Sequence, residues 1–359
     1  MTEAQLVDNL LKFISAGAST EESFNRMAMQ ILAYQFENNP PYHKFCLQKG
    51  TTPRIVQSWR EIPAVPINGY KNLTLSCRPR EKIERVFMTS GTTKGNVKGK
   101  CYHPFLSVYD RSMIINFKNR FMKERDKIRM GILFPTEEQM PNSSLAHYLA
   151  LALKEFGMRG SSYLLLKEGL NFEKIFFELA NSEKTDEPYA LLGASYSFVH
   201  LMDQMESKER SFSLPEGSKI LDTGGFKSQS REMDLDSFYS NLSKKFGVPR
   251  SQCTNMYGMT ELSTQFYDWG NETCPPVKSG PHWIRTRIVN PLNSVELPEG
   301  TSGILLHCDL AHFNCVSSIL TEDTGVKVGD GFLLTGRASG AEAKGCSLAV
   351  EEFLKSAGE

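Results

Sequence analysis

The chain lacks an excess of charge of either sign and also lacks long apolar runs. Its 41 basic residues balance 41 acidic ones, and the two kinds are interleaved along the sequence. A protein that binds nucleic acid presents a basic surface, and a membrane-spanning helix contains roughly 18 consecutive apolar residues. The N-terminus opens with Met1, Thr2 and Glu3, an acidic start where a secretory signal has basic residues. We expect a cytoplasmic protein without a membrane span or a nucleic-acid partner.

Clustered cysteines are missing as well. The eight cysteines are scattered, with no C-x-x-C pair and no Cys/His group at the spacing of metal ligands. This pattern argues against structural zinc and against a disulfide framework. We expect most of these cysteines to be small buried hydrophobic residues.

The most informative stretch runs from Thr89 to Lys98 and is rich in glycine, hydroxyl and lysine side chains. Glycines let backbone N–H groups turn toward phosphate oxygens, hydroxyls donate further hydrogen bonds, and lysine neutralises charge. A polar hairpin tip without a ligand can have the same composition. A P-loop is excluded, because neither Gly91 nor Gly95 is followed by the G-x-x-x-x-G-K-[ST] pattern.

The apolar pattern predicts an α/β fold. Spacings of three and four over residues 3–37 predict two helices, which Asn39 and two prolines end. Farther along, buried strands alternate with helices, which indicates largely parallel sheets with ligands at the carboxyl ends of strands. The expected strands are residues 85–88, 130–134, 161–166, 190–194 and 219–222, and the expected helices are 143–156, 172–180, 196–205 and 231–246. Short strands between turns over residues 283–334 predict a small β-rich lobe.

Further motifs follow the Thr89–Lys98 stretch in a fixed order. They are Gly224-Gly225, then Tyr257-Gly258-Met259-Thr260-Glu261, then Thr321-Glu322-Asp323-Thr324-Gly325, then Thr335-Gly336-Arg337. Together they resemble the adenylate-forming superfamily of acyl-CoA synthetases, peptide-synthetase adenylation domains and luciferases, whose members carry T-S-G-T-T-G-x-P-K, G-G and Y-G-x-T-E in this order.

Several further runs narrow the resemblance. They are Ile62-Pro63-Ala64-Val65-Pro66-Ile67 with Tyr70-Lys71, Pro281-His282-Trp283-Ile284-Arg285-Thr286-Arg287, Leu297-Pro298-Glu299-Gly300-Thr301-Ser302-Gly303 and Lys344-Gly345-Cys346-Ser347-Leu348. With these runs the chain looks most like the acyl-protein synthetases that feed fatty acid reductases in bacterial bioluminescence. It is also similar to adenylating proteins of phenazine antibiotic biosynthesis.

The resemblance implies a multilayer adenylation domain over residues 1–340. Its parts would be a mainly helical beginning at 1–85, an α/β core with mostly parallel sheets at 86–275 and the β-rich lobe at 276–340, followed by a short C-terminal tail at 341–359. Relatives usually continue for about a hundred residues as a mobile domain that carries a catalytic lysine, whereas only 22 residues follow Arg337 here. We expect that domain to be missing, so that the second half-reaction needs another arrangement or a partner.

The resemblance also implies a reaction. The carboxylate of an acid attacks the α-phosphorus of ATP to give acyl-AMP and pyrophosphate, while Mg²⁺ and preorganised donors stabilise the developing charge. The loop residues expected to contact the β- and γ-phosphates are Thr89, Ser90, Gly91, Thr92, Thr93, Gly95 and Lys98. By resemblance, Thr260 would donate to the α-phosphate and Glu261 would hold Mg²⁺. Tyr257 would stack on adenine, with Gly258, Gly224 and Gly225 beside it. Asp323 would bind ribose, and Arg337 would bind ribose or phosphate.

Alternatives remain for several of these residues. The loop departs from the family pattern, with Lys94 before Gly95, so that either Lys94 or Lys98 could face phosphate; their order favours Lys98. Taken alone, Tyr257 could be a core tyrosine, Glu261 a surface carboxylate, and Asp323 a turn residue. The ordered set of motifs favours the functional interpretation.

The acid pocket is expected to include Ser195, Tyr196 and Phe226. Aromatic residues beside small ones favour a planar aromatic or phenazine carboxylate by a small margin, and a fatty chain fits the same criteria. A nucleotide-binding scaffold without catalysis is a further possibility, because the usual catalytic lysine is absent.

By resemblance, the thiol of Cys346 receives the acyl group and passes it to a reductase partner. Lys344 would lower the pKa of this thiol if the two side chains meet. The alternative is a structural cysteine packed on the last helix.

Overall fold

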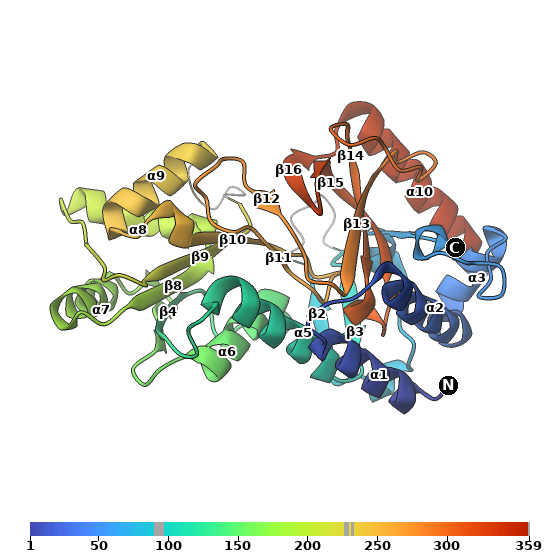
Figure 1. Cartoon of the computed structure of the whole chain (residues 1–359), viewed down its shortest axis with the longest axis horizontal. Helices are drawn as coiled ribbons and strands as arrows, with labels where there is room; N and C mark the ends of the chain where they lie inside the picture. The colour runs from blue at the N-terminus through green and yellow to red at the C-terminus, as the bar shows by residue number, and fades with distance from the viewer. Residues whose placement is uncertain (90–96, 226–229, 231–232, 358–359) are drawn as a thin grey trace. The chain divides into compact units, whose positions relative to one another are not determined.

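The computed structural model describes residues 1–89, 97–225, 230 and 233–357. The chain divides into two compact units, each assembled from segments distant in sequence (Figure 1). Unit 1 comprises Met1–Ile115, Met259–Gln265 and Ser279–Glu359, and unit 2 comprises Asn116–Gly258 and Phe266–Lys278. Helices and sheets are present in both, so the predicted α/β class is confirmed. The domain boundaries expected from the sequence stay a prediction.

Unit 1 begins with the helices α1 (Glu3–Ser15), α2 (Glu21–Asn38) and α3 (Pro40–Gln48). Thr2 and Thr20 each close a capping box at the first turn of their helix. The prolines end α2 as expected but also begin α3, because a proline in the first helical turn loses no hydrogen bond.

The main sheet of unit 1 is antiparallel. Its strands β13 (Ile284–Val289), β14 (Ser302–Asp309), β15 (Ser318–Val328) and β16 (Gly331–Arg337) pair in chain order. The short strand β1 (Val65–Pro66) adds to the start of β15 in parallel. The β-rich lobe predicted over residues 283–334 therefore exists, and it recruits a strand from the N-terminal region.

The remaining elements of unit 1 surround this sheet. A separate hairpin joins β2 (Arg85–Met88) to β3 (Lys100–His103). The other helices are η1 (Trp59–Glu61), α4 (Gly69–Asn72), η2 (Arg80–Lys82), α5 (Ser107–Phe117), η5 (Leu310–His312) and α10 (Gly340–Ala357). Helix α10 occupies most of the segment expected to be a tail, and it packs on α3, α4, β1 and β15.

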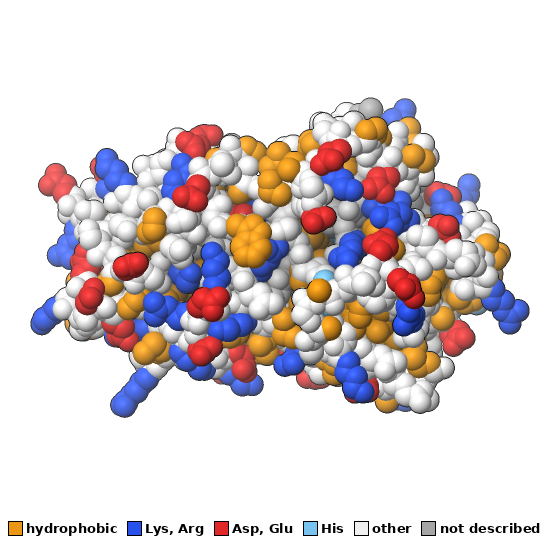
Figure 2. Space-filling view, viewed as in Figure 1, with side chains coloured by type: hydrophobic (Ala, Val, Ile, Leu, Met, Phe, Trp, Pro, Cys, Tyr) orange, Lys and Arg blue, Asp and Glu red, His pale blue; other side chains and the backbone are white. Residues whose placement is uncertain are grey.

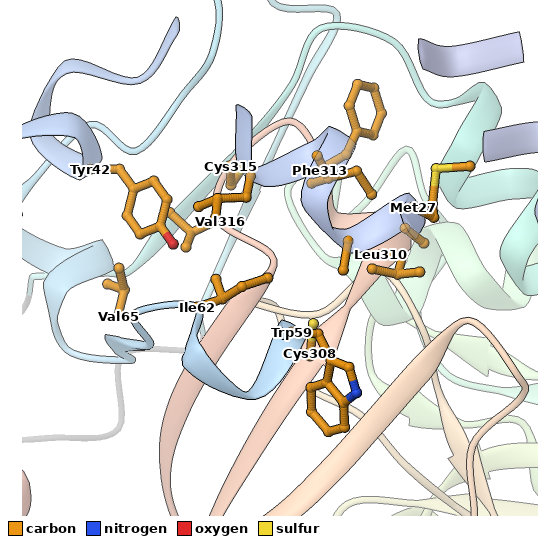
Figure 3. Packing of buried hydrophobic residues seen from close by; sticks show 14 of the residues in the cluster. Met27, Tyr42, Trp59, Ile62, Val65, Cys308, Leu310, Phe313, Cys315 and Val316 are labelled. Carbon is orange, nitrogen blue, oxygen red and sulfur yellow. The ribbon is translucent and has the colours of Figure 1, made fainter. Parts of the chain in front are cut away.

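The core of unit 1 joins the N-terminal helices to the sheet. Figure 3 shows Tyr42, Ile62 and Val65 close to residues from the β14–β15 connection. The Tyr42 hydroxyl donates to the Pro63 carbonyl at 3.0 Å, so this buried ring keeps a polar partner. At the other end of the core, the centroids of the Phe353 and Phe45 rings lie 4.8 Å apart, so that α10 packs on α3 through these two rings.

Unit 2 is built on a mostly parallel sheet with the order β11-β10-β9-β8-β4-β5. Strands β8 (Tyr189–Ala194) and β9 (Lys219–Thr223) are buried along their whole length, as expected for central parallel strands. Helices α8 (Ser195–Ser207) and α9 (Leu235–Phe246) lie on one side of the sheet, and α6 (Ser144–Phe156) lies on the other (Figure 1). The remaining elements are η3 (Lys118–Met122), β4 (Arg129–Leu133), β5 (Ser162–Tyr163), β6 (Leu165–Leu166), β7 (Gly169–Leu170), α7 (Phe172–Thr185), η4 (Arg250–Gln252), β10 (Cys253–Tyr257), β11 (Phe266–Tyr267) and β12 (Val277–Lys278).

One strand prediction was wrong. Residues 161–166 were expected to form a single strand, but they form β5 in the main sheet and β6 in a separate hairpin with β7. The chain leaves the main sheet after Leu164, whose N–H donates to the Ile132 carbonyl at 2.8 Å. Apolar composition does not show such a change of partner, because both short strands contain leucine or tyrosine.

Charged side chains of both signs are interspersed on the face in Figure 2. Among the described residues, no helix has the length and apolar character needed to cross a bilayer.

The carboxyl edge of the unit 2 sheet is organised by the buried carboxylate of Asp222. Its oxygens accept hydrogen bonds from the Ser195 hydroxyl at 2.7 Å, the Asn255 amide at 2.8 Å and the Tyr239 hydroxyl at 3.4 Å. Burial raises the pKa of Asp222 to about 6, although the hydrogen bonds from Ser195 and Asn255 act in the opposite direction. Lys278 also lowers this pKa.

We predict that Asp222→Asn changes the pH dependence of stability. The folded-state pKa of Asp222 is raised above its ordinary value of 3.8, so its contribution to stability is full below about pH 4 and is lost as the pH rises through about 6. Between pH 4 and pH 7 the wild type should lose roughly 2–3 kcal/mol relative to Asp222→Asn, since one pKa unit is about 1.4 kcal/mol. Urea unfolding at both pH values measures this change. Asn at the exposed Asp186 is the control, and a difference between wild type and Asp222→Asn that is constant with pH would contradict the assignment.

Candidate functional site

A buried carboxylate holds the segment after Thr260 and Glu261 in place within unit 1. Asp309, at the end of β14, accepts hydrogen bonds from the backbone N–H groups of Ser263 at 2.8 Å and Thr264 at 2.9 Å. Its other oxygen accepts the Thr264 hydroxyl at 2.7 Å. Burial raises the pKa of Asp309, and these hydrogen bonds act in the opposite direction. The backbone beside Glu261 is therefore fixed to the sheet.

Glu261 is itself buried, with 3% of its surface exposed. Burial raises the pKa of its carboxyl to about 7, while its own backbone N–H, His312 and Lys71 lower it and Asp323 raises it. Glu261 thus lies within electrostatic reach of Lys71 and Asp323, which come from distant parts of the sequence. The surface-carboxylate alternative for Glu261 is excluded by this burial.

The loop end of the β2–β3 hairpin lies against the Glu261 side chain. The Thr89 N–H donates to the Gly99 carbonyl at 3.0 Å, and the Gly99 N–H donates to the Thr89 hydroxyl at 2.9 Å. A Cβ atom at Gly99 would lie 3.0 Å from the Glu261 Oε1 atom. A side chain at position 99 would therefore press on the Glu261 carboxylate.

Much of the predicted phosphate loop falls outside the described residues. Thr89 is half-buried at the loop end of the hairpin, and Lys98 is exposed. The predicted phosphate contacts that lie outside the described residues are Ser90, Gly91, Thr92, Thr93 and Gly95, together with the alternative lysine Lys94.

Asp323 and Arg337 are brought together by strand pairing. They are partners in the β15–β16 register, and the Arg337 Nε atom lies 3.4 Å from the Asp323 Oδ1 atom. Arg337 also lies 3.9 Å from Glu322, while 61% of its side chain stays exposed. Both residues expected at the nucleotide thus share one edge of the sheet of unit 1.

The carboxylates in unit 1 suit a hard divalent cation. Mg²⁺ commonly binds through one or two carboxylates and completes its shell with water and phosphate oxygens. Buried Glu261, with Asp323 in electrostatic reach, offers that chemistry. In the described part of the chain, no three His, Cys, Asp or Glu side chains are grouped to hold a metal by themselves. The donor set fits an ion that arrives with nucleotide phosphates.

Unit 2 carries the residues expected at adenine and at the acid. Tyr257 ends β10, is half-buried, and has its ring 5.9 Å from the Phe266 ring. Gly258 follows and is exposed. The Gly224-Gly225 turn directly follows the carboxyl end of β9. Gly224 has a φ of +76°, a backbone conformation that favours glycine.

The expected acid-pocket residues have different environments. Ser195 is buried at the start of α8, and its hydroxyl is bonded to Asp222. Tyr196 is half-buried, and its ring lies 6.4 Å from the His200 ring. Phe226 lies outside the described residues. The hydroxyl of Ser195 therefore supports the sheet edge in this structure.

Cys346 lies on α10 and is buried, with its Sγ atom 3.8 Å from the Thr321 carbonyl oxygen. Burial, together with the carboxylates of Glu322 and Glu342, raises the pKa of this thiol to about 11. The expected lowering of this pKa by Lys344 was wrong, since the charges acting on the thiol are negative. In this arrangement Cys346 is a protonated thiol.

Sequence reasoning missed Lys71, Asp222 and Asp309 as parts of the candidate site. Lys71 belongs to the Tyr70-Lys71 run that resembles the acyl-protein synthetases, and this was the one available signal. Asp222 directly precedes the Thr223-Gly224-Gly225 turn. Asp309 follows an apolar strand and carries no motif.

Comparison with known proteins agrees with the resemblance seen in the motifs. Residues 12–355 match the family described as acyl-protein synthetase, LuxE. The long-chain-fatty-acid–luciferin-component ligase of Vibrio harveyi is 21% identical over 338 residues, which cover 91% of this chain and 87% of that protein.

Solved ligase structures share the fold. A 2-hydroxyisobutyryl-CoA ligase in complex with 2-HIB-AMP has a TM-score of 0.63 at 14% identity, covering 88% of this chain and 67% of that chain. ATP-bound MatB from Rhodopseudomonas palustris has a TM-score of 0.52 at 15% identity, covering 72% of this chain and 49% of that chain. The adenylate-forming type of fold predicted from the sequence is thereby confirmed.

The family match extends over nearly the whole chain, from the first helix to α10. This protein therefore belongs to the LuxE acyl-protein synthetase family.

Proposed function

We propose that this protein uses ATP and Mg²⁺ to activate a long-chain fatty acid as acyl-AMP, and then passes the acyl group by way of a thioester to a reductase partner. The observation that carries the proposal is the buried Glu261 carboxylate, which lies at the loop end of the β2–β3 hairpin within electrostatic reach of Asp323. Family membership supports ligase chemistry at this place.

The acid we propose differs from the one favoured by the sequence. Small and aromatic residues favoured a planar aromatic or phenazine carboxylate, with a fatty acid as the alternative. The name of the Vibrio harveyi relative specifies a long-chain fatty acid and supports that alternative. We therefore propose a fatty acid, and no finding supports a role in phenazine or antibiotic biosynthesis.

Each site residue has a proposed role in the first half-reaction. Asp323 accepts the ribose hydroxyls, with Arg337 beside it, and Tyr257 stacks on adenine next to Gly258 and the Gly224-Gly225 turn. Thr260 donates to the α-phosphate, and Glu261 holds Mg²⁺, which when bound neutralises phosphate charge. The β- and γ-phosphates are assigned to Thr89, Ser90, Gly91, Thr92, Thr93, Gly95 and Lys98, and the acid to a pocket that includes Tyr196 and Phe226, with Ser195 supporting its wall.

In this reaction a carboxylate oxygen of the fatty acid bonds to the α-phosphorus, and the bond to the bridging oxygen of pyrophosphate breaks. The transition state carries extra negative charge on the α-phosphate oxygens. Donors held in place before the reaction stabilise that charge without reorganisation. The Asp309 hydrogen bonds supply such rigidity to the backbone next to Thr260 and Glu261.

The second half-reaction needs a thiol acceptor, for which we propose Cys346. Its sulfur would bond to the acyl carbon of acyl-AMP and lose its proton, and AMP would leave. Because the thiol is buried and its pKa is about 11, we propose that this part of α10 moves before the transfer.

The function is tested by exchange of labelled pyrophosphate into ATP in the presence of Mg²⁺ and one acid at a time. Saturated fatty acids of graded chain length should support exchange, whereas benzoate and a phenazine carboxylate should not. Each methylene that enters an apolar pocket contributes about 0.8 kcal/mol, so the half-saturating concentration should fall roughly fourfold per added carbon until the pocket is full. Exchange with the aromatic acids alone would restore the first substrate prediction. Nucleotide binding without exchange for any acid would instead indicate a scaffold.

We predict that Glu261→Gln lowers the exchange rate by about a hundredfold or more. The amide has the shape of the carboxylate but lacks the charge that Mg²⁺ needs, and such metal contacts supply several kcal/mol of stabilisation. A Mg²⁺ titration of the exchange rate measures the loss, with circular dichroism to verify the fold. Glu272→Gln, at an exposed glutamate, is the matched control. An unchanged rate with unchanged Mg²⁺ dependence in Glu261→Gln would remove the residue from the site.

A further prediction concerns the acceptor. Incubation with ATP and a labelled fatty acid should leave a hydroxylamine-sensitive thioester on Cys346 of the wild type and none on Cys346→Ser, which should still catalyse pyrophosphate exchange. Of the eight cysteines, Cys274 is the one that is not buried, so Cys274→Ser controls for acylation governed by exposure alone. Peptide mass spectrometry identifies the site. Normal exchange by the wild type with no adduct on Cys346 would exclude this cysteine as the acceptor.

A further inference from the structure

The short helix α4 is attached to the strand that leads to Asp323. Just before α4, the Ile67 N–H donates to the Leu320 carbonyl at 2.9 Å, which continues the parallel pairing of β1 with β15. The Asn68 amide donates to the Glu322 carboxylate. The first turn of α4 thus lies alongside residues 320–322 and brings Lys71 to the part of unit 1 that contains Asp323.

The rest of α4 is fixed on two further sides. Tyr70 is 1% exposed, with its ring 6.1 Å from the His312 ring and its hydroxyl donating to the Val316 carbonyl at 3.5 Å. A Cβ atom at Gly69 would lie 2.6 Å from the Phe353 ring of α10. The helix also contacts β3, which forms one side of the hairpin that packs against Glu261. The backbone of Lys71 is therefore held between the hairpin and the β15 strand.

The Lys71 side chain is half-buried, and within the described residues its ammonium has no hydrogen bond or ion pair. Its charge nevertheless lowers the pKa of Glu261, so the ammonium lies within electrostatic reach of the buried carboxylate. Other cations of unit 1 near these residues differ from it. Arg337 is paired with Glu322 and Asp323, and Lys98 is exposed.

We propose that Lys71 is a further catalytic residue, whose ammonium binds the α-phosphate of the nucleotide between Asp323 and Glu261. This inference rests on the proposed function, which puts ribose at Asp323 and phosphate-bound Mg²⁺ at Glu261. The α-phosphate is attached directly to the ribose, so it must lie between these two side chains. An ammonium there neutralises the charge that develops as the acid oxygen bonds to phosphorus and pyrophosphate leaves. Lys71 keeps its protons throughout.

The firmly anchored backbone around Lys71 suits this role. A lysine side chain is flexible, and its contribution to a transition state falls if the chain must be ordered during the reaction. Asn68, Gly69 and Tyr70 place the Cα atom of Lys71 before the nucleotide binds. The side chain then needs to order only its own methylene groups.

The test compares binding of AMP, which has the α-phosphate, with binding of adenosine, which lacks it. In the full chain, Lys71→Met should weaken AMP about tenfold or more and leave adenosine unchanged, since a hydrogen bond to a charged group is worth about 1.5–3 kcal/mol. Lys71→Arg should recover most of the AMP affinity, and Lys82→Met, at an exposed lysine, should change neither ligand. The rate of acid-dependent pyrophosphate exchange should fall about a hundredfold in Lys71→Met, with little change in the KM for the acid.

Two results would overturn the proposal. Equal loss of AMP and adenosine binding in Lys71→Met would make Lys71 a structural residue, and unchanged AMP binding with unchanged exchange would remove it from the phosphate. The binding comparison does not depend on which acid is activated. Absence of exchange in the wild type would therefore reject the proposed function. The AMP and adenosine measurements would still decide whether Lys71 contacts the phosphate.

Discussion

The candidate site in unit 1 depends on the hydrogen bonds to Asp309. A buried carboxylate is costly unless its oxygens are satisfied, and those of Asp309 accept two backbone N–H groups and a hydroxyl from residues 263–264. These partners lie in the segment 259–265, which has no regular secondary structure of its own. Without Asp309 that segment would have to satisfy its N–H groups elsewhere, and Glu261 would lose its fixed position. One acidic residue at the end of a strand thus determines where another acidic residue stands.

Burial then sets the chemistry of Glu261. In water its carboxylate would be ionised at neutral pH, but removal from solvent raises its pKa to about 7. Positive charge stabilises the ionised form of Glu261, and His312 and Lys71 in unit 1 supply part of that charge. The divalent cation proposed above would supply the rest and complete the ionisation of this carboxylate.

Some of this could be predicted from the sequence, because certain features are local. The parallel strand β8 was visible as a continuous apolar run, and the order of the motifs indicated an adenylating fold. Residues 161–166 could not be divided between two sheets, since the change of partner at Leu164 is a tertiary event. Likewise, Lys71 and Asp323 come within electrostatic reach of Glu261 from distant segments, and periodicity holds no information about such long-range proximity. The environment of Cys346 was also misjudged: Lys344 is adjacent in sequence, but the charges that reach the thiol come from Glu322 and Glu342.

The buried position of Cys346 has a consequence for the durability of the protein. Oxidants attack exposed thiolates, and a thiol kept protonated and away from solvent reacts slowly with peroxide. With α10 packed as it is, the sulfur next to the Thr321 carbonyl is shielded from sulfenic acid formation and from exchange with small disulfides. For the acyl acceptor proposed above, this shielding would keep the thiol intact until the transfer.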